Sequence, residues 1–188
     1  MQRAFHFIIG FAILAFMAFS PASLASEELS TSEQVNPGKT VELFTRVSPG
    51  IYRGAQPTEE GLRQLKAAGI RTIVNFRNET EVIAHEKALA RELGLAYVSL
   101  PWRIQRLAQP AVFEAFFKIV EDESAHPIFY HCRRGTERTG VATTLYLMKY
   151  HQLSADEAYA QAFDGFPLKW IWKDNVKRQL KHLTQHFN

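Results

Sequence analysis

The chain has 188 residues, 46% of them hydrophobic and 22% charged, and a formal net charge of +3. This length and apolar content suffice for a single domain with one good core. The charge is small and the lysines and arginines are scattered, which excludes an extended nucleic-acid-binding surface, so we expect no nucleic-acid partner.

The first 25 residues have the pattern of a secretory signal peptide. Arg3 precedes an apolar run over residues 5–19, and the small residues Ser23 and Ala25 follow it, a pattern typical of cleavage after Ala25. The run is shorter than the roughly 20 residues that span a bilayer, so an uncleaved membrane anchor is the alternative. We therefore expect an exported protein, periplasmic in a Gram-negative bacterium, with no stable membrane span after cleavage.

The remaining chain divides into a leader and one domain. Residues 26–40 are polar and predict a flexible leader, and residues 41–188 predict a single catalytic domain. The hydrophobic periodicity predicts the following elements in chain order: a strand from residue 51, a helix over 59–68, strands over 71–77 and 96–100 separated by a helix over 78–94, a helix over 109–123, a strand over 127–130, and helices over 139–150, 154–163 and 168–187.

Capping residues and strand composition support this order of elements. Thr58 predicts one helix start, and the capping boxes Asn78–Glu81 and Ser154–Glu157 predict two more. The β-branched residues of the strand over 71–77 are typical of a parallel strand covered on both faces. The alternation predicts an α/β fold, a central and mostly parallel sheet of about four to five strands flanked by helices on both faces.

The decapeptide HCRRGTERTG, residues 131–140, concentrates the chemistry of the chain. Cys132 is the only cysteine, so it is either an inert buried thiol or a reactive one. A free thiol has a pKa of about 8.5, which nearby cations and a helix N-terminus lower, and both are expected here. Burying three arginines without an anion would be costly. The sequence therefore predicts a thiolate in a loop that binds an oxyanion.

The loop between Cys132 and Arg138 has the features of a phosphate cradle. It is short enough for its amides to turn inward as an anion-binding nest. Gly135 permits a backbone conformation with positive φ, and the planar fork of Arg138 can hold two phosphate oxygens. Attack by the sulfur on a bound phosphorus would give a phosphocysteine intermediate.

The decapeptide matches the H-C-x5-R-[ST]-G signature of the protein tyrosine and dual-specificity phosphatases and resembles the atypical dual-specificity branch known from plants and fungi. Residues 52–57 (YRGAQP) and 69–77 (GIRTIVNFR) resemble that branch in order and spacing. The resemblance covers about residues 50–150. It implies a phosphatase acting on phosphotyrosine, phosphoserine or phosphothreonine, a phosphoinositide or an inositol phosphate.

The resemblance and the loop chemistry together predict the roles of the site residues. Cys132 is the nucleophile, Arg138 the phosphate clamp, and Thr139 a hydrogen-bond partner of the sulfur. His131 would hold the strand end and favour the thiolate. The predicted phosphate-binding residues are Arg133, Arg134, Gly135, Thr136, Glu137 and Arg138. Neither a metal nor a cofactor is required by this chemistry.

The proton donor for the leaving group is not evident from the sequence. The resembling family often carries it in the loop after Pro101, but residues 101–110 contain no Asp or Glu. Glu137 is the first candidate because some bacterial members of the superfamily have an acid there; the alternative is that it pairs with a loop arginine. Asp164 is the second candidate. The missing acid keeps open a phosphate-binding pseudophosphatase module without turnover.

Two other classes of cysteine-dependent protein fit less well. Rhodanese-type sulfurtransferases do not require an arginine that closes the loop at this spacing, and arsenate reduction normally needs further cysteines.

Several arginines outside the decapeptide have open roles. Arg53 either reaches the mouth of the site or lies on the surface, and we favour the surface. Arg77 either supports the loop or pairs with Glu79 or Glu81. A mouth that favours polyanions is predicted from Arg103, Arg106, Arg133 and Arg134.

Overall fold

The computed structural model describes residues 36–166 and 168–187. Their strands form one five-stranded sheet in the order β1-β2-β5-β3-β4. The antiparallel pair is β1–β2, and all other pairs are parallel. The strand bounds are Thr45–Ser48 (β1), Ile51–Gly54 (β2), Thr72–Asn75 (β3), Ala96–Ser99 (β4) and Ile128–His131 (β5). The predicted mostly parallel sheet is confirmed.

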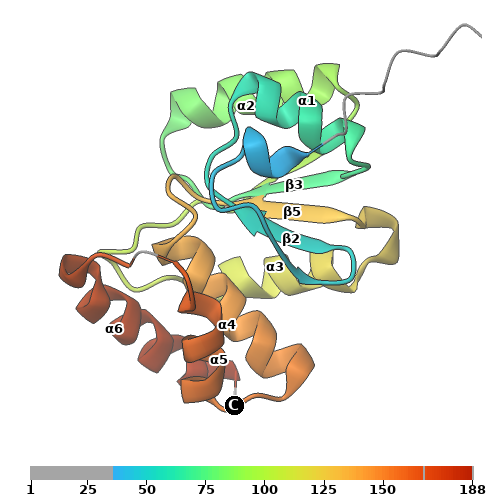
Figure 1. The fold of residues 1–188 in the computed structure, drawn as a ribbon. Coiled ribbons are helices and arrows are strands. Elements are labelled where there is room, and N and C mark those ends of the chain that lie inside the picture. The colour runs from blue at the N-terminus through green and yellow to red at the C-terminus, as the bar shows by residue number, and fades with distance from the viewer. Residues whose placement is uncertain (1–35, 167, 188) are drawn as a thin grey trace, which may run out of the picture. The chain divides into compact units, whose positions relative to one another are not determined.

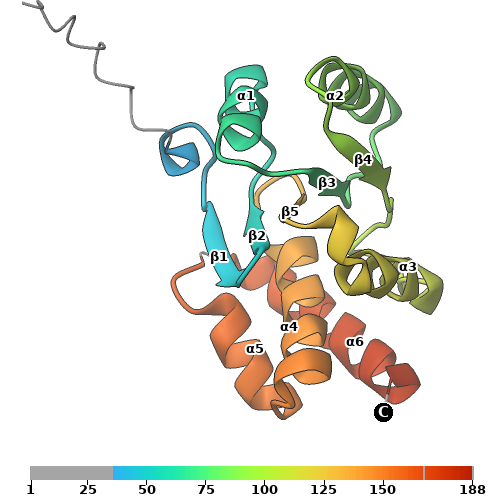
Figure 2. The same ribbon diagram turned by 90° about the vertical axis from the view of Figure 1, so that its right-hand side faces the viewer.

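Helices cover both faces of this sheet (Figures 1 and 2). One face carries α1 and α2, and the other carries α3, α4, α5 and α6. The helix bounds are Glu59–Ala67 (α1), Thr80–Glu92 (α2), Pro110–Glu121 (α3), Glu137–His151 (α4), Ala155–Phe163 (α5) and Trp170–Phe187 (α6), with short 3-10 helices at Pro37–Lys39 and Glu123–Ala125. The predicted three-layer α/β/α architecture is confirmed.

Each face of the sheet has its own apolar core. Along β5, Ile128 and Tyr130 are buried against the α3–α6 side, whereas Phe129 between them is buried against α1 and α2. This alternation follows from the two-residue period of a strand. Because both faces of β5 are covered, its first three residues are all aliphatic or aromatic, as expected for a central parallel strand.

The middle of the sheet brings three strand ends together. β5 lies between β2 and β3 and is parallel to both, with His131 in register with Gly54 on one side and Asn75 on the other. Open α/β sheets bind ligands outside the carboxyl ends of such neighbouring strands. The fold therefore places the loop after β5, which carries Cys132, at the position where a site is expected.

The start of α2 differs from the sequence prediction. The prediction of a capping box formed by Asn78 and Glu81 is wrong. The helix begins at Thr80, and its N-cap Glu79 makes no side-chain cap hydrogen bond. The Asn78 side chain instead accepts a hydrogen bond from the guanidinium of Arg138 at 3.0 Å. A charged donor from a distant part of the chain has replaced the local cap. The capping box at Ser154, by contrast, is present.

The N-terminal predictions fall largely outside the described residues. The signal peptide over 1–25 lies there entirely, so export and the alternative membrane anchor stay predictions; N-terminal sequencing of the protein from fractionated cells would distinguish them. The 3-10 helix Pro37–Lys39, with Pro37 buried, extends the folded chain into the segment 26–40. Within the described residues, every helix is too short or too polar to cross a membrane.

Candidate active site

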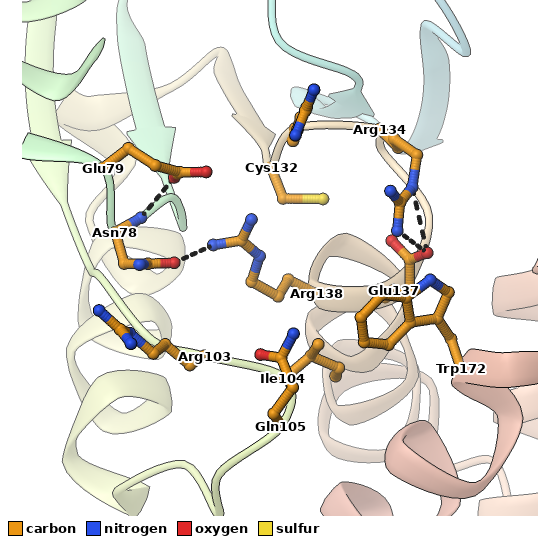
Figure 3. Close-up of a pocket in the computed structure, with 11 residues that line it drawn as sticks. Asn78, Glu79, Arg103, Ile104, Gln105, Cys132, Arg134, Glu137, Arg138 and Trp172 are labelled. Carbon is orange, nitrogen blue, oxygen red and sulfur yellow. Dashed lines mark hydrogen bonds and ion pairs between the residues drawn. The ribbon is translucent and has the colours of Figure 1, made fainter. Parts of the chain in front are cut away.

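A pocket of about 360 Å³ lies where β5 and α4 meet (Figure 3). Cys132, directly after β5, and Arg138, in the first turn of α4, both line it. Its other lining residues are Asn78, Glu79, Arg103, Ile104, Gln105, Arg133, Arg134, Glu137 and Trp172. Although Cys132 is only 1% exposed, the residue forms part of the pocket lining and is therefore not sealed in the core.

The loop after β5 is held from behind through three of its carbonyl groups. The contacts are Cys132 O with His131 Nδ1 at 3.2 Å, Arg133 O with the backbone N–H of Gln56 at 3.2 Å, and Gly135 O with Arg53 Nη2 at 2.8 Å. The C=O and N–H of a trans peptide point in opposite directions. The amides of residues 133, 134 and 136 therefore point to the other side of the loop, as an anion-binding nest requires.

Gly135 is required by two separate features of this loop. Its φ is +71°, a backbone conformation that residues with a side chain rarely adopt. A Cβ atom here would also lie 2.6 Å from the carbonyl carbon of Gly54 and 2.7 Å from the amide nitrogen of Ala55. The loop and the end of β2 can approach this closely only with glycine at this position.

Arg138 is oriented by three acceptors that all bind one of its nitrogens. Nη1 donates to Phe76 O at 2.9 Å, to Asn78 Oδ1 at 3.0 Å and to Trp102 O at 3.2 Å. The described residues offer no acceptor to Nε or Nη2 at hydrogen-bonding distance. These two N–H groups form the edge of the guanidinium that binds two oxygens of a tetrahedral anion.

Thr139 does not make the predicted hydrogen bond to the Cys132 sulfur. Its Oγ1 is buried and has no hydrogen-bond partner among the described residues. Thr139 lies in the first turn of α4, and its backbone carbonyl accepts a hydrogen bond from Thr143 Oγ1 at 2.8 Å.

His131 lies against a buried carboxylate that the sequence analysis missed. Its Nε2 is 3.2 Å from Glu86 Oε1, in a contact where the N–H is not well aligned, and both side chains are buried. Glu86 also accepts hydrogen bonds from Gln56 Nε2 at 2.5 Å and from Tyr97 OH at 2.8 Å, as well as from Asn75 Nδ2. The network joins α2 to the strand end that carries Cys132. A single acid interrupting the apolar stripe of α2 was the signal available in the sequence.

The surroundings of Glu86 favour its ionised form. Burial alone would raise the pKa of Glu86, but the nearby charge of His131 and the hydrogen bonds from Tyr97 and Asn75 outweigh burial and lower the pKa below its ordinary value. A carboxylate with a lowered folded-state pKa stabilises the fold above its unfolded pKa of about 4.3, and this stabilisation is lost as the pH falls through the folded-state pKa.

We expect Glu86→Ala to lower the free energy of unfolding by about 3–5 kcal/mol at pH 7, because His131, Asn75 and Tyr97 lose a buried acceptor. Urea denaturation measures the loss. The difference from the native protein should shrink as the pH falls through the folded-state pKa of Glu86. Glu81→Ala, on the exposed side of the same helix, is the matched control and should change little. An equal effect of the two substitutions would contradict the network.

The prediction that Arg53 lies on the surface is wrong. The side chain is 1% exposed and reaches from β2 beneath the loop over residues 132–138, here called the phosphate loop. A hydrophilic residue in a strand usually faces solvent, but here the backbone carbonyls of two distant segments, Gly135 and Ala162, provide acceptors.

Arg77 forms the ion pair that was one of its two predicted roles. Its Nη2 lies 3.1 Å from Glu79 Oε1. The hydrogen bond from Arg77 lowers the pKa of Glu79 to about 2. Because of this low pKa, Glu79 is an anion at neutral pH. Its side chain lines the pocket (Figure 3).

Of the two candidate acids, Glu137 lines the pocket and Asp164 does not. The Glu137 carboxylate accepts from Arg134 Nη2 at 2.5 Å (Figure 3). It also accepts from Thr136 Oγ1 at 2.9 Å. Asp164 is exposed at the end of α5. The predicted pairing of Glu137 with a loop arginine is present, and its role as an acid stays a prediction.

The wall of the pocket formed by residues 103–105 is held by a residue that the sequence analysis missed. Gln179, fully buried on α6, binds Ala108 N, Ile104 O and Arg106 O at 3.0, 2.9 and 2.6 Å. The apolar stripe of α6 packs on the core as predicted, but it also contains this polar anchor. Of the loop arginines predicted at the mouth, Arg103 lines the pocket and Arg106 does not.

A cysteine at the end of a central parallel strand, followed by an amide-lined loop and an arginine in the next helix, defines the cysteine-dependent phosphatase class. The model of the family described as "DSP-PTPase phosphatase fused to NAD+ Kinase" matches residues 29–176 of the chain. The chain belongs to this family, and the predicted resemblance is confirmed.

Individual relatives agree with this assignment. The chain is 24% identical to the dual specificity protein phosphatase TpbA of Pseudomonas aeruginosa over 74% of its own length and 60% of that protein. It is 31% identical to inositol diphosphatase DSP3 of Arabidopsis thaliana, over 70% of this chain and 66% of that protein. The crystal structure of a putative phosphatase from Shewanella putrefaciens has the same fold, with a TM-score of 0.67 and 19% identity over 81% of this chain and 97% of that one.

Proposed function

We propose that the chain is a phosphatase that hydrolyses phosphomonoesters through a phosphocysteine intermediate. The observation that carries the proposal is the placement in one pocket of Cys132 and of the Arg138 edge formed by Nε and Nη2, which has no acceptor among the described residues. A phosphoryl group bound by this edge and by the loop amides lies within reach of the sulfur. Charge on its equatorial oxygens is then met by donors that are already oriented.

The proposed reaction has two steps. The Cys132 sulfur attacks phosphorus, the bond from phosphorus to the leaving oxygen breaks, and that oxygen takes a proton from a general acid. A water molecule then attacks the phosphorus of the phosphocysteine and gives a proton to the former general acid, now a base. The bond from phosphorus to sulfur breaks, which releases inorganic phosphate and restores the thiolate. Arg138 binds the phosphoryl oxygens throughout both steps.

Glu137 is the carboxyl group best suited to be the acid. The carboxylates among the described pocket residues are Glu79 and Glu137. Glu79, with its pKa lowered to about 2 by Arg77, holds no proton to donate at neutral pH. Glu137 must exchange its contact with the half-exposed Arg134 side chain for one with the leaving oxygen. Since an acid candidate is present in the pocket, the acid-free loop over 101–110 no longer favours a pseudophosphatase.

We expect Glu137→Gln to slow the hydrolysis of phenyl phosphate by about 10²–10³-fold, because its leaving oxygen needs a proton. Hydrolysis of 2,4-dinitrophenyl phosphate, whose phenolate leaves unprotonated, should change little. Steady-state kinetics on the two substrates measure the contrast, and Glu79→Gln is the control. Equal losses on both substrates would remove Glu137 from the role of acid.

The substrate is proposed to be a phosphorylated protein or a small polyanion. Arg103, Arg133 and Arg134 line the pocket around Arg138, and the names of two relatives specify a protein phosphatase and an inositol diphosphatase. Trp172 adds an aromatic wall that could stack on a phosphotyrosine ring. Phosphate release from phosphopeptides, phosphoinositides and inositol phosphates, measured side by side, distinguishes these substrates.

A further inference from the structure

We propose that Arg53 is a positioning residue of the phosphate loop and the buried counter-ion of the Cys132 thiolate. The inference rests on the proposed function of the same site. Arg53 projects from β2, the neighbour of β5, and β5 ends one residue before Cys132. Its guanidinium donates from Nη1 to Ala162 O at 2.7 Å and from Nη2 to Gly135 O at 2.8 Å, and stacks 3.8 Å from the ring centroid of Phe166.

The charge of this guanidinium is not matched by a carboxylate. Within the described residues, no Asp or Glu oxygen lies within 4.0 Å of it, and its Nε is buried without a partner. Carbonyl dipoles and an aromatic face compensate a buried cation only in part. Burial lowers the pKa of Arg53, and negative charge on Tyr130 or Cys132 opposes the shift. Of these two groups, Tyr130 stays neutral, because burial raises the pKa of its hydroxyl to about 12.

The other charges near Cys132 are either paired or also serve the bound anion. His131 lies against Glu86, Arg77 against Glu79, and Arg134 against Glu137. Because each of these groups lies against its own carboxylate, its net effect on the sulfur is reduced. The charged residues that line the pocket together with Cys132 are Glu79 from the segment before α2, Arg103 from the loop before α3, Arg133 and Arg134 from the loop after β5, and Glu137 and Arg138 from α4. The other titratable groups on the adjoining elements are Arg53 on β2, Tyr130 and His131 on β5, and Arg77 after β3.

Arg53 also determines how one loop amide is directed. Its Nη2 holds the Gly135 carbonyl beneath the loop. Because the Gly135 C=O and the Thr136 N–H belong to one peptide, they point in opposite directions. Glycine leaves this peptide free to rotate, so the hydrogen bond from Arg53 is what fixes the Thr136 amide toward the anion. One side chain thereby couples the charge on the sulfur to the shape of the cradle.

The test is the pH dependence of Cys132 alkylation by iodoacetamide, which requires no turnover. In Arg53→Met, which removes the charge and keeps the length, we expect alkylation at pH 6 to be at least about 10-fold slower and its pH profile to move to higher pH. We also expect kcat to fall by on the order of 10²-fold, more than KM changes, because one oxyanion donor is lost. Arg46→Met, on the exposed strand β1, is the matched control and should leave both measurements unchanged.

A folded Arg53→Met protein with the native alkylation profile would overturn the proposal. If that variant does not fold, Arg53→Lys decides instead. Lysine keeps the charge but cannot reach both carbonyls with a fork, so we expect a near-native alkylation profile with vanadate inhibition weakened about 10-fold. Native vanadate inhibition in a folded Arg53→Lys protein would contradict the positioning role. Absence of phosphate release from the native protein would contradict the proposed function and still leave the alkylation result readable.

Discussion

We expect a Cys132→Ser protein to release phosphate from p-nitrophenyl phosphate at the background rate, a loss on the order of 10⁴-fold or more. Serine has nearly the same shape, but its hydroxyl stays protonated and is a far weaker nucleophile than a thiolate. Measuring phosphate release under steady-state conditions gives the result directly.

The binding of phosphate should survive this substitution. The loop amides and the N–H edge of Arg138 do not depend on the sulfur for their positions, because Arg53, Gln56 and Asn78 hold them. Phosphate or vanadate should therefore still raise the unfolding temperature of Cys132→Ser. Turnover that persists in this variant would end the phosphocysteine mechanism, whereas loss of both turnover and binding would point to a damaged loop.

Arg138→Lys should reduce kcat/KM by about 10²–10³-fold. The guanidinium is fixed through Nη1 by Phe76 O, Asn78 Oδ1 and Trp102 O while its other edge faces the pocket. An ammonium group can satisfy one of these two sets of partners but not both. Kinetics with p-nitrophenyl phosphate and inhibition by vanadate together measure the loss of transition-state and anion binding.

Arg63→Lys is the matched control for this substitution. Arg63 lies exposed on α1, where it pairs with Glu59 on the same helix, so the exchange should leave kinetics unchanged. An Arg138→Lys protein with native kcat/KM and native vanadate inhibition would show that the fork is not what binds the phosphoryl group.

The sequence was sufficient for features that depend on neighbouring residues. Strand composition and helix periodicity predicted the central strands and the flanking helices, and the capping box at Ser154 formed as expected. The phosphate loop was predictable because its glycine, its cysteine and its closing arginine lie within one decapeptide. These features have local physical causes, and local causes can be recognised in a single sequence.

The features that were missed depend on distant partners. The carbonyl acceptors of Arg53 lie 82 and 109 residues away in the chain, and the Gln179 side chain binds a loop 71 to 75 residues before it. Glu86 interrupts an apolar stripe on α2, but its partner His131 lies on β5. A polar residue at a buried position indicates that a partner exists; only the tertiary structure identifies that partner.

The most direct test of the mechanism is to identify the residue that carries the phosphoryl group during turnover. The native protein is mixed with substrate, quenched rapidly in alkaline denaturant, which preserves phosphohistidine as well as phosphocysteine, digested and analysed by tandem mass spectrometry. We expect the phosphoryl group on Cys132. Rapid hydrolysis with the phosphoryl group found instead on His131, or with no phosphorylated peptide at any quench time, would contradict the mechanism.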